Sequence, residues 1–221
     1  MIPIAHIENA FDTKFGVPRQ SGLVEELRGL VVFEPEYRDE QALRGIEEFS
    51  HLWLLWEFSE AKRDTWSPTV RPPRLGGNAR MGVFATRSPF RPNAIGLSCV
   101  KLVGIRKDPA RGCMLEIAGA DMMNGTPIYD IKPYLPYADC HPEATGGFTD
   151  VVERHTLQVE IPPELECKIP EQLRAALRGV LAQDPRPGYQ QDPDRVYGMR
   201  YGEQDIRFQV RDGIARVVEI Q

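Results

Sequence analysis

Short apolar runs broken by proline and glycine constrain the fold of this chain more than any other feature of its sequence. Its 221 residues include 19 prolines and 19 glycines, and helical periodicity is scarce. Short runs rich in β-branched and aromatic residues, bounded by turn residues, are typical of strands. We expect strands at residues 2–7, 30–33, 52–58, 80–85, 95–105, 114–118, 128–132 and 157–161. The sequence therefore predicts a mainly β protein, built as a barrel or a sandwich.

One of these runs, at residues 52–58, begins with five apolar residues in succession. Because polar residues do not alternate with them, we expect this strand to be covered by neighbours on both faces. A short surface helix is expected separately, at residues 38–46.

The C-terminal part of the chain has a different pattern. Residues 170–182 carry apolar side chains at helical spacing and predict one amphipathic helix. The pair Asp212-Gly213 predicts a tight turn between two strands. We therefore expect residues 1–160 to form the β domain and residues 161–221 to form a small α+β appendage.

Composition narrows the class of protein. No apolar run approaches the roughly 18 residues that cross a bilayer, and the N-terminus lacks the pattern of a signal peptide, so we expect a cytoplasmic protein without a membrane segment. The four cysteines form no Cys-x-x-Cys pair, and no spacing of His, Cys and carboxylates indicates a metal site. The net charge of −5 argues mildly against nucleic-acid binding, although a local basic patch is compatible with it.

The segment that most strongly suggests a functional site is residues 84–98, Phe-Ala-Thr-Arg-Ser-Pro-Phe-Arg-Pro-Asn-Ala-Ile-Gly-Leu-Ser. Each proline fixes its own φ and pushes the preceding residue towards an extended conformation. Arg87 and Arg91 therefore lie on a stiff, non-helical stretch, where a guanidinium can be aimed at a carboxylate or a phosphate. We expect an anion-handling loop here, and a weak surface ion pair of Arg87 is the plainer alternative.

Three further segments combine turn residues with polar or aromatic side chains. Residues 14–20 join a cation, a glycine and an amide, while residues 121–127 contain a tight turn whose backbone N–H groups could face a ligand. A plain structural turn is the alternative for both. Residues 130–139 hold two tyrosines, a lysine and two aspartates around two prolines, which suits a base-stacking or substrate wall. His51 stands apart without a nucleophile motif, and no glycine-rich nucleotide motif is present.

Together these segments resemble the TrmO family, also called TsaA-like or YaeB-like. The resemblance rests on Phe15-Gly-Val-Pro-Arg-Gln20, Arg87-Ser-Pro-Phe-Arg-Pro-Asn-Ala-Ile-Gly-Leu-Ser98, Asn124-Gly-Thr-Pro127 and Asp130-Ile-Lys-Pro-Tyr-Leu-Pro-Tyr-Ala-Asp139. Residues 184–190 are similar to the C-terminal segment of bacterial members, so the resemblance covers nearly the whole chain. Ala94 stands where the family more often has proline, and Met123-Asn124 replace the more usual Leu-Asp.

The resemblance implies a fold, a cofactor and an activity. Family members are S-adenosylmethionine-dependent tRNA methyltransferases that modify N6 of threonylcarbamoyladenosine, the base just 3′ of the anticodon in threonine tRNA. Their fold is a single-sheet antiparallel β-barrel, and they form homodimers. By motif position, the cofactor contacts fall on Pro18, Arg19, Gln20, His51, Leu52, Arg87, Leu97, Met123, Asn124, Gly125 and Thr126. An arginine among them can clamp the carboxylate of S-adenosylmethionine, and the leucines with the turn backbone can hold its adenosine.

The residues on the acceptor side follow from the chemistry of the modified base. Its N6 is urea-like and becomes a better nucleophile when it loses its proton, which calls for a base. We expect Asp130 in this catalytic role, with Asp139 as the other candidate. Substrate contacts are expected at Arg91, Asn93, Lys132, Tyr134, Tyr137, Asp139, Arg186 and Tyr189. The tyrosines would stack the base, the cations would hold a carboxylate or phosphate, and residues 186 and 189 would grip the anticodon stem-loop.

Two other functions stay open from the sequence. A catalytically silent RNA-binding module would use the same arginines and tyrosines, but it would not bind S-adenosylmethionine. A phosphate-handling enzyme built on Arg87 and Arg91 would be inhibited by phosphate or nucleotides and indifferent to S-adenosylhomocysteine. Neither of these explains the whole set of motifs.

Overall fold

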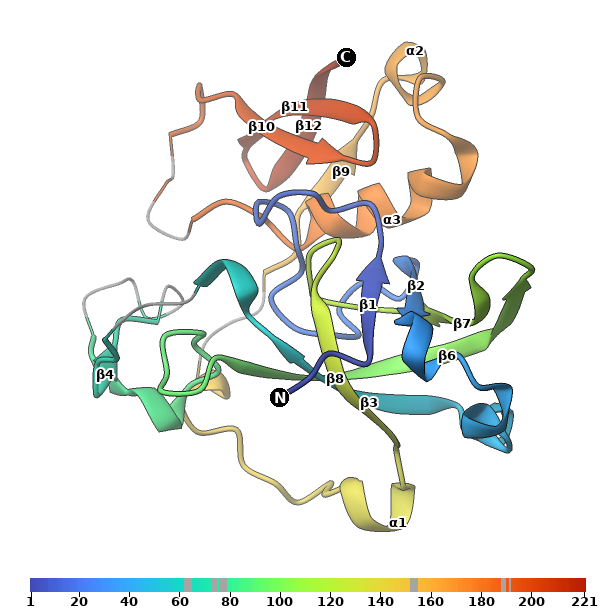
Figure 1. The fold of residues 1–221 in the computed structure, drawn as a ribbon. Helices are drawn as coiled ribbons and strands as arrows, with labels where there is room; N and C mark the ends of the chain where they lie inside the picture. Colours follow the sequence, from blue (N-terminus) through green and yellow to red (C-terminus); the bar gives the residue numbers. More distant parts are fainter. Residues whose placement is uncertain (62–64, 73–74, 76–78, 152–154, 188–189, 191) are drawn as a thin grey trace.

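The structure of the protein is a computed structural model of residues 1–221. It describes all of them except residues 62–64, 73–74, 76–78, 152–154, 188–189 and 191. Figure 1 shows a large set of strands in the lower part of the molecule and a smaller C-terminal sheet above it, with helix α3 between the two. A short arm that carries strand β4 projects to one side of the larger unit.

Six strands form one closed antiparallel sheet. They are β1 (Ala5–Glu8), β2 (Arg28–Phe33), β3 (His51–Glu57), β6 (Ile95–Asp108), β7 (Gly112–Ala118) and β8 (Pro127–Pro133). Hydrogen bonds join them in the order β1-β2-β7-β6-β3-β8, and β8 pairs again with β1, so the sheet closes into a barrel. Closure removes the exposed strand edges that an open sheet would present. The prediction of a mainly β fold is confirmed, and the predicted strands at these positions are found within a few residues.

Strand β3 alternates in burial despite its apolar composition. Leu52, Leu54 and Trp56 are buried inside the barrel, whereas Trp53 and Leu55 between them are partly exposed on the outer face. The prediction that both faces of this strand are covered is therefore wrong. A barrel encloses only the inner face of each strand, so period-two alternation persists even where the outer residues are apolar.

Two local predictions fail because the chain turns instead of extending. Only Met81–Gly82 of the strand expected at residues 80–85 pairs, as β5, with β4 (Thr69–Val70), and Val83–Ala85 form a 3-10 turn, η6. The helix expected at residues 38–46 is replaced by 3-10 turns, which Gly45 interrupts at φ 86°. The short turns and helices of this part are η1 (Pro35–Tyr37), η2 (Glu40–Leu43), η3 (Ile46–Glu48), η4 (Ser59–Ala61), α1 (Pro136–Asp139) and η7 (Gly147–Thr149).

The C-terminal unit is a second sheet covered by a helix. It contains β9 (Gln158–Glu160), α2 (Pro163–Glu166), α3 (Glu171–Ala182), β10 (Tyr197–Tyr201), β11 (Gln204–Arg211) and β12 (Ile214–Ile220). The sheet order is β10-β11-β12-β9, with β9 parallel to β12. The amphipathic helix and the hairpin turn are confirmed, and Asp212 and Gly213 both have the positive φ that a tight hairpin turn requires.

The two units share part of one hydrophobic core. Phe11, Val24 and Leu27, from the long loop between β1 and β2, pack with the buried residues of the C-terminal sheet and α3. Strand β9 pairs with β12 in the C-terminal sheet. A boundary after residue 160 would therefore assign β9 to the N-terminal domain and separate it from its own sheet. The division into two domains stays a prediction, and the N-terminal loop connects the two units physically.

Gly96 should be intolerant of a side chain because Trp56 lies across it. A Cβ at Gly96 would come within 2.2 Å of the Trp56 ring, whereas a Cβ at Gly104 on the same strand meets nothing within 4 Å. We expect Gly96→Ala to lower the free energy of unfolding by ~1–3 kcal/mol. Gly104→Ala is the matched control and should be neutral or stabilising by up to ~1 kcal/mol. Urea denaturation of both variants checks this, and equal effects would contradict the close approach.

Candidate functional site

Gln20 and Arg87, from two distant loops, are in direct contact. Arg87 Nη1 donates a hydrogen bond to Gln20 Oε1, and Gln20 Nε2 donates to the carbonyl oxygen of Arg19. Pro18 is buried beside them, while the Arg87 side chain is exposed. The structure therefore brings together predicted cofactor residues from the N-terminal loop and the arginine loop. The remaining N–H groups of the guanidinium can bind a carboxylate.

Arg19 connects this loop to the C-terminal unit. Its Nη2 donates to the carbonyl oxygens of Asp184 at 3.3 Å and Arg186 at 3.0 Å. The Arg186 guanidinium forms a two-pronged ion pair with the Asp184 carboxylate, with N–O distances of 2.8 and 2.9 Å, and this hydrogen bonding raises the pKa of Arg186. Arg186, a predicted RNA contact, is thus engaged within its own turn. Tyr189, the other predicted contact of this segment, lies outside the described residues.

A buried polar chain leads from the barrel interior towards Arg87. Trp56 Nε1 donates to Ser98 Oγ at 2.8 Å, and Ser98 Oγ donates to Asp121 Oδ1 at 2.5 Å. Burial raises the pKa of Asp121, while the hydrogen bond from Ser98, backbone N–H groups and the charge of Arg87 oppose the rise. Asp121 is therefore a partly buried carboxyl next to the arginine loop, and it can face a cation there.

The turn Met123–Thr126 has a structural role that the sequence did not indicate. Its N–H groups are used within the protein: Asn124 donates to Phe11 O at 2.8 Å, Gly125 to Ile7 O at 2.8 Å, and Thr126 to Met123 O at 3.2 Å. These three N–H groups are therefore engaged within the protein, and a contact of residues 123–126 with the adenosine stays a prediction. These hydrogen bonds attach the turn to the start of the N-terminal loop.

A row across three neighbouring strands brings Leu97 and Asp130 near each other. Leu55 on β3 pairs with Leu97 on β6 and with Asp130 on β8. Neighbouring strands are about 4.8 Å apart, so the two outer Cα atoms are about 10 Å apart. The Asp130 carboxylate accepts a hydrogen bond from the N–H of Ile131 at 2.9 Å and pairs with Lys132 Nζ at 2.8 Å. A predicted cofactor residue and the predicted base thus share one outer face of the barrel.

His51 and Leu52 lie at the start of β3, whereas the row of Leu97, Leu55 and Asp130 lies further along the strand. Leu52 is fully buried in the barrel core. His51 pairs with Lys101, which is four residues beyond Leu97 on β6, or about 13 Å along the strand. Within one chain, the structure does not bring these two predicted residues to Arg87.

Tyr134, Trp53 and Asp139 form a second cluster, beside His51. The Tyr134 ring is tilted against Trp53 at a centroid distance of 5.8 Å and meets His51 edge-on at 6.2 Å. Asp139 Oδ2 accepts hydrogen bonds from the N–H of Leu135 at 2.8 Å and from Trp53 Nε1 at 3.0 Å, and these bonds lower the pKa of Asp139. Asp139 therefore holds α1 against β3. This structural role favours Asp130 over Asp139 as the candidate base.

Three predicted substrate residues are placed by their loops. Arg91 Nη1 donates to the carbonyl oxygen of Thr86 at 3.2 Å, and the N–H of Ile95 donates to the carbonyl oxygen of Asn93 at 2.8 Å. Both contacts stabilise the arginine loop and leave the Asn93 side chain exposed. Tyr137, on α1, is 87% exposed and free to stack on another ring.

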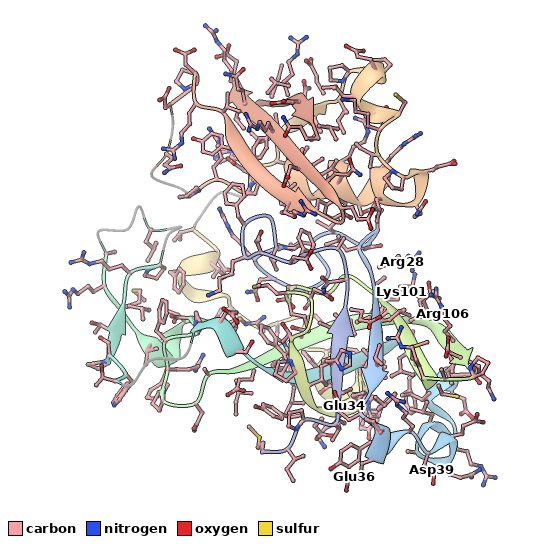
Figure 2. All side chains as sticks on the ribbon, turned by 45° about the horizontal axis from the view of Figure 1, so that its top comes forward. Arg28, Glu34, Glu36, Asp39, Lys101 and Arg106 are labelled. Atoms are coloured by element: carbon pink, nitrogen blue, oxygen red, sulfur yellow. The ribbon has the colours of Figure 1, made fainter. Side chains whose placement is uncertain are left out.

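Charged side chains gather on two parts of the barrel surface. Figure 2 shows Arg28, Lys101 and Arg106 on one flank, and Glu34, Glu36 and Asp39 after the end of β2. A shallow groove of about 320 Å³ between β2 and α3 is lined by Arg28 and Arg106 but by none of the predicted site residues. Of the predicted cofactor residues, Arg19, Arg87 and Leu97 are exposed, whereas Pro18, Leu52 and Thr126 are buried.

The described residues contain no group of histidine, cysteine and acidic side chains that could hold a metal ion. No helix in the described part of the chain is both long and apolar enough to cross a membrane.

Two family models together match most of the chain. The model of the tRNA-methyltransferase O N-terminal domain matches residues 6–140, and the model of the TrmO C-terminal domain matches residues 154–221. The chain belongs to the TrmO family. The resemblance inferred from the loop motifs is thereby confirmed.

Other members of the TrmO family are similar over nearly the full length. The chain is 42% identical over 219 residues to the tRNA (adenine(37)-N6)-methyltransferase of Escherichia coli (strain K12), a match that covers 95% of this chain and 92% of that protein. The mouse protein of the same name, from Mus musculus, is 36% identical over 89% of this chain and 44% of its own length. The crystal structure of TrmO from Pseudomonas aeruginosa has a TM-score of 0.78 and 33% identity, covering 99% of this chain and 97% of that one.

Sequence reasoning missed Ser98 and Asp121 as partners in this TrmO protein. Both lie in segments that the motifs highlight, but they are 23 residues apart and meet only through the barrel register. An aspartate inside the apolar stretch before Asn124-Gly125 is the feature that could have indicated a buried carboxyl.

Asp121→Asn should remove a pH-dependent loss of stability. Because the pKa of Asp121 is raised in the folded protein, the free energy of unfolding falls as pH rises from the ordinary value of 3.8 through the raised value. The amide oxygen can still accept from Ser98 without the charge. Urea unfolding between about pH 4 and pH 8 should show the variant gaining stability relative to wild type as pH rises. The control is Asp212→Asn, in the exposed hairpin turn, and a pH-independent difference for Asp121→Asn would contradict the shift.

Proposed function

We propose that the protein methylates N6 of threonylcarbamoyladenosine, next to the anticodon of threonine tRNA. As a TrmO family member, the protein is a methyltransferase that uses S-adenosylmethionine. The proposal that tRNA is the substrate is supported by the match to both family models. It is also supported by relatives that are named tRNA (adenine(37)-N6)-methyltransferase. The threonylcarbamoyl group is the finer part of the proposal, and the cations near the candidate base support it.

The charged and apolar side chains around Arg87 are chemically suited to binding S-adenosylmethionine. Arg87 can bind its carboxylate, and the Asp121 carboxyl can face a cationic group. The partly buried Leu55 and the half-exposed Leu97 offer apolar contact to its adenosine. When bound, S-adenosylmethionine supplies an electrophilic methyl group. The protein's own contribution is then alignment of the acceptor nitrogen and removal of its proton.

Asp130 is the proposed proton acceptor. It is partly exposed on β8, and its ion pair with Lys132 keeps the carboxylate close to a cation. The same Lys132, or Arg91 on the arginine loop, can hold the threonyl carboxylate of the substrate. The exposed ring of Tyr137 is available to stack on the base or on a neighbouring base.

The C-terminal unit is proposed as the second tRNA contact, and the enzyme as a cytoplasmic homodimer. Ile95 and Leu97 expose apolar side chains on the outer face of β6, a surface of the type that subunit interfaces cover. Truncating the C-terminal unit would not isolate its role, because Arg19 donates to its backbone. Point variants are therefore the cleaner probes of that contact.

The rival functions explain less. A silent RNA-binding module does not account for relatives named as methyltransferases. A phosphate-handling enzyme does not account for relatives named as S-adenosylmethionine-dependent methyltransferases.

The proposed reaction predicts a specific change in tRNA. Cells that lack this protein should lose the N6-methylated form of threonylcarbamoyladenosine and retain the unmethylated form, because the precursor base is made independently of this methyl transfer. Mass spectrometry of tRNA nucleosides checks this, with complementation by the wild-type protein as the control. An unchanged nucleoside profile would reject this substrate while leaving the family assignment in place.

Substitutions at Arg87 and Asp130 should separate binding from turnover. Arg87→Ala should weaken S-adenosylmethionine binding about 10- to 100-fold, since a hydrogen bond to a charged group contributes ~1.5–3 kcal/mol. Asp130→Asn should leave this affinity unchanged but lower turnover about 100-fold or more, because it removes the proton acceptor. Calorimetry and single-turnover methylation give the two readouts. Full activity of Asp130→Asn with bound cofactor would show that Asp130 is not the base.

A further inference from the structure

The arm between β3 and β6 has a charge pattern unlike the rest of the chain. We define the arm as residues 65–94, which include five arginines and no aspartate or glutamate, although the whole chain has a net charge of −5. Arg71, Arg80 and Arg87 are exposed, and none of the arm's described arginines forms an ion pair with a carboxylate of the described residues. The arm is therefore a locally cationic surface on an acidic protein.

Two exposed aromatic rings lie together on this cationic arm. Trp66 is 51% exposed and Phe84 is 72% exposed, and their rings stack at a centroid distance of 6.1 Å and an interplanar angle of 26°. The arm's strand pairing aligns them, since Thr69 pairs with Gly82 and the N–H of Val83 donates to Pro68 O at 2.9 Å. Such a pair is a large apolar surface for a protein to leave in water, which marks it as a contact site.

The arginines around the rings favour RNA over protein as the occupant. Proteins recognise unpaired RNA by stacking bases on aromatic rings and contacting phosphates with guanidinium groups. The core of a protein–protein interface is instead depleted of charged residues. Five arginines without a single carboxylate match the RNA pattern.

The arm is continuous with the candidate cofactor site. Arg87 follows Phe84 by three residues, and the N–H of Thr86 donates to Val83 O, which closes the turn between them. Lys14 Nζ donates to the carbonyl oxygen of Glu60 at 2.6 Å, so the segment between β3 and the arm also contacts the loop that carries Gln20. In Figure 1 the arm lies on the side of the barrel, apart from the C-terminal sheet.

We propose that Trp66 and Phe84 form a stacking platform for unpaired loop bases that neighbour the methylated adenosine. Arg71 and Arg80, which are exposed on the arm, contact the phosphates of the same nucleotides. This inference rests on the proposed tRNA function and adds to it an aromatic contact surface to which no role was assigned from the sequence.

The test compares an RNA hairpin that carries the unpaired anticodon loop with a fully paired duplex of the same length. With full-length protein, the double variant Trp66→Leu, Phe84→Leu should bind the hairpin about 5- to 100-fold more weakly, the range expected for loss of base stacking. Duplex binding and S-adenosylmethionine affinity should not change. Trp66→Phe keeps an aromatic face and should retain hairpin affinity. Val218→Ala, which trims an exposed side chain on β12, is the control and should also bind normally.

Several outcomes would overturn the platform. Unchanged hairpin affinity in the double variant would reject it, and an equal loss for hairpin and duplex would assign the contact to charge alone. Dissociation of a dimer at unchanged affinity per chain, measured by sedimentation, would assign the rings to an interface between copies. Methylation of tRNA by the wild-type protein is measured in parallel, so failure of the proposed function is recognised separately from failure of the platform.

Discussion

Closure of the barrel between β1 and β8 is the constraint on which the candidate site depends. Only Ala5 and His6 pair with β8 there, opposite Ile128 and Pro127. The turn before β8 extends this short contact, because its N–H groups donate to Ile7 and Phe11. The loop that follows Phe11 carries Pro18 to Gln20, so its starting point is set by the last pairing of the barrel. This short seam thus helps to position three of the predicted cofactor residues, Pro18, Arg19 and Gln20.

The sequence predicted the elements well where local pattern decides them. The six barrel strands, the amphipathic helix and the hairpin at residues 212–213 follow from alternation, helical spacing and turn chemistry. The sequence-based prediction failed at residues 38–46, where Gly45 interrupts the expected helix. It also failed at β3, where the apolar outer residues suggested that the outer face is covered as fully as the inner one. Periodicity describes which residues are apolar, but the partner of each face depends on closure of the whole sheet.

The site was predictable residue by residue but not as an arrangement. Motif resemblance identified Gln20 and Arg87, and the structure shows them in contact. The Ser98–Asp121 hydrogen bond was not predictable, because it joins positions that only the pairing of β6 with β7, in which Lys101 lies opposite Ala118, brings together. The sequence therefore indicated which side chains belong to the candidate site, whereas their contacts depend on the register of the paired strands.

The two carboxyls of the site differ in the way that separate roles require. Asp130 is partly exposed beside Lys132, so its carboxylate is accessible from solvent and lies next to a cation. Asp121 is surrounded by the barrel wall, and burial disfavours its charge unless a cation is present. A carboxyl in the first environment can exchange a proton with a substrate from solvent, whereas one in the second responds mainly to the charge next to it. The two environments therefore support the proposed proton transfer on the outer face of β8 and the proposed charge recognition beside Arg87.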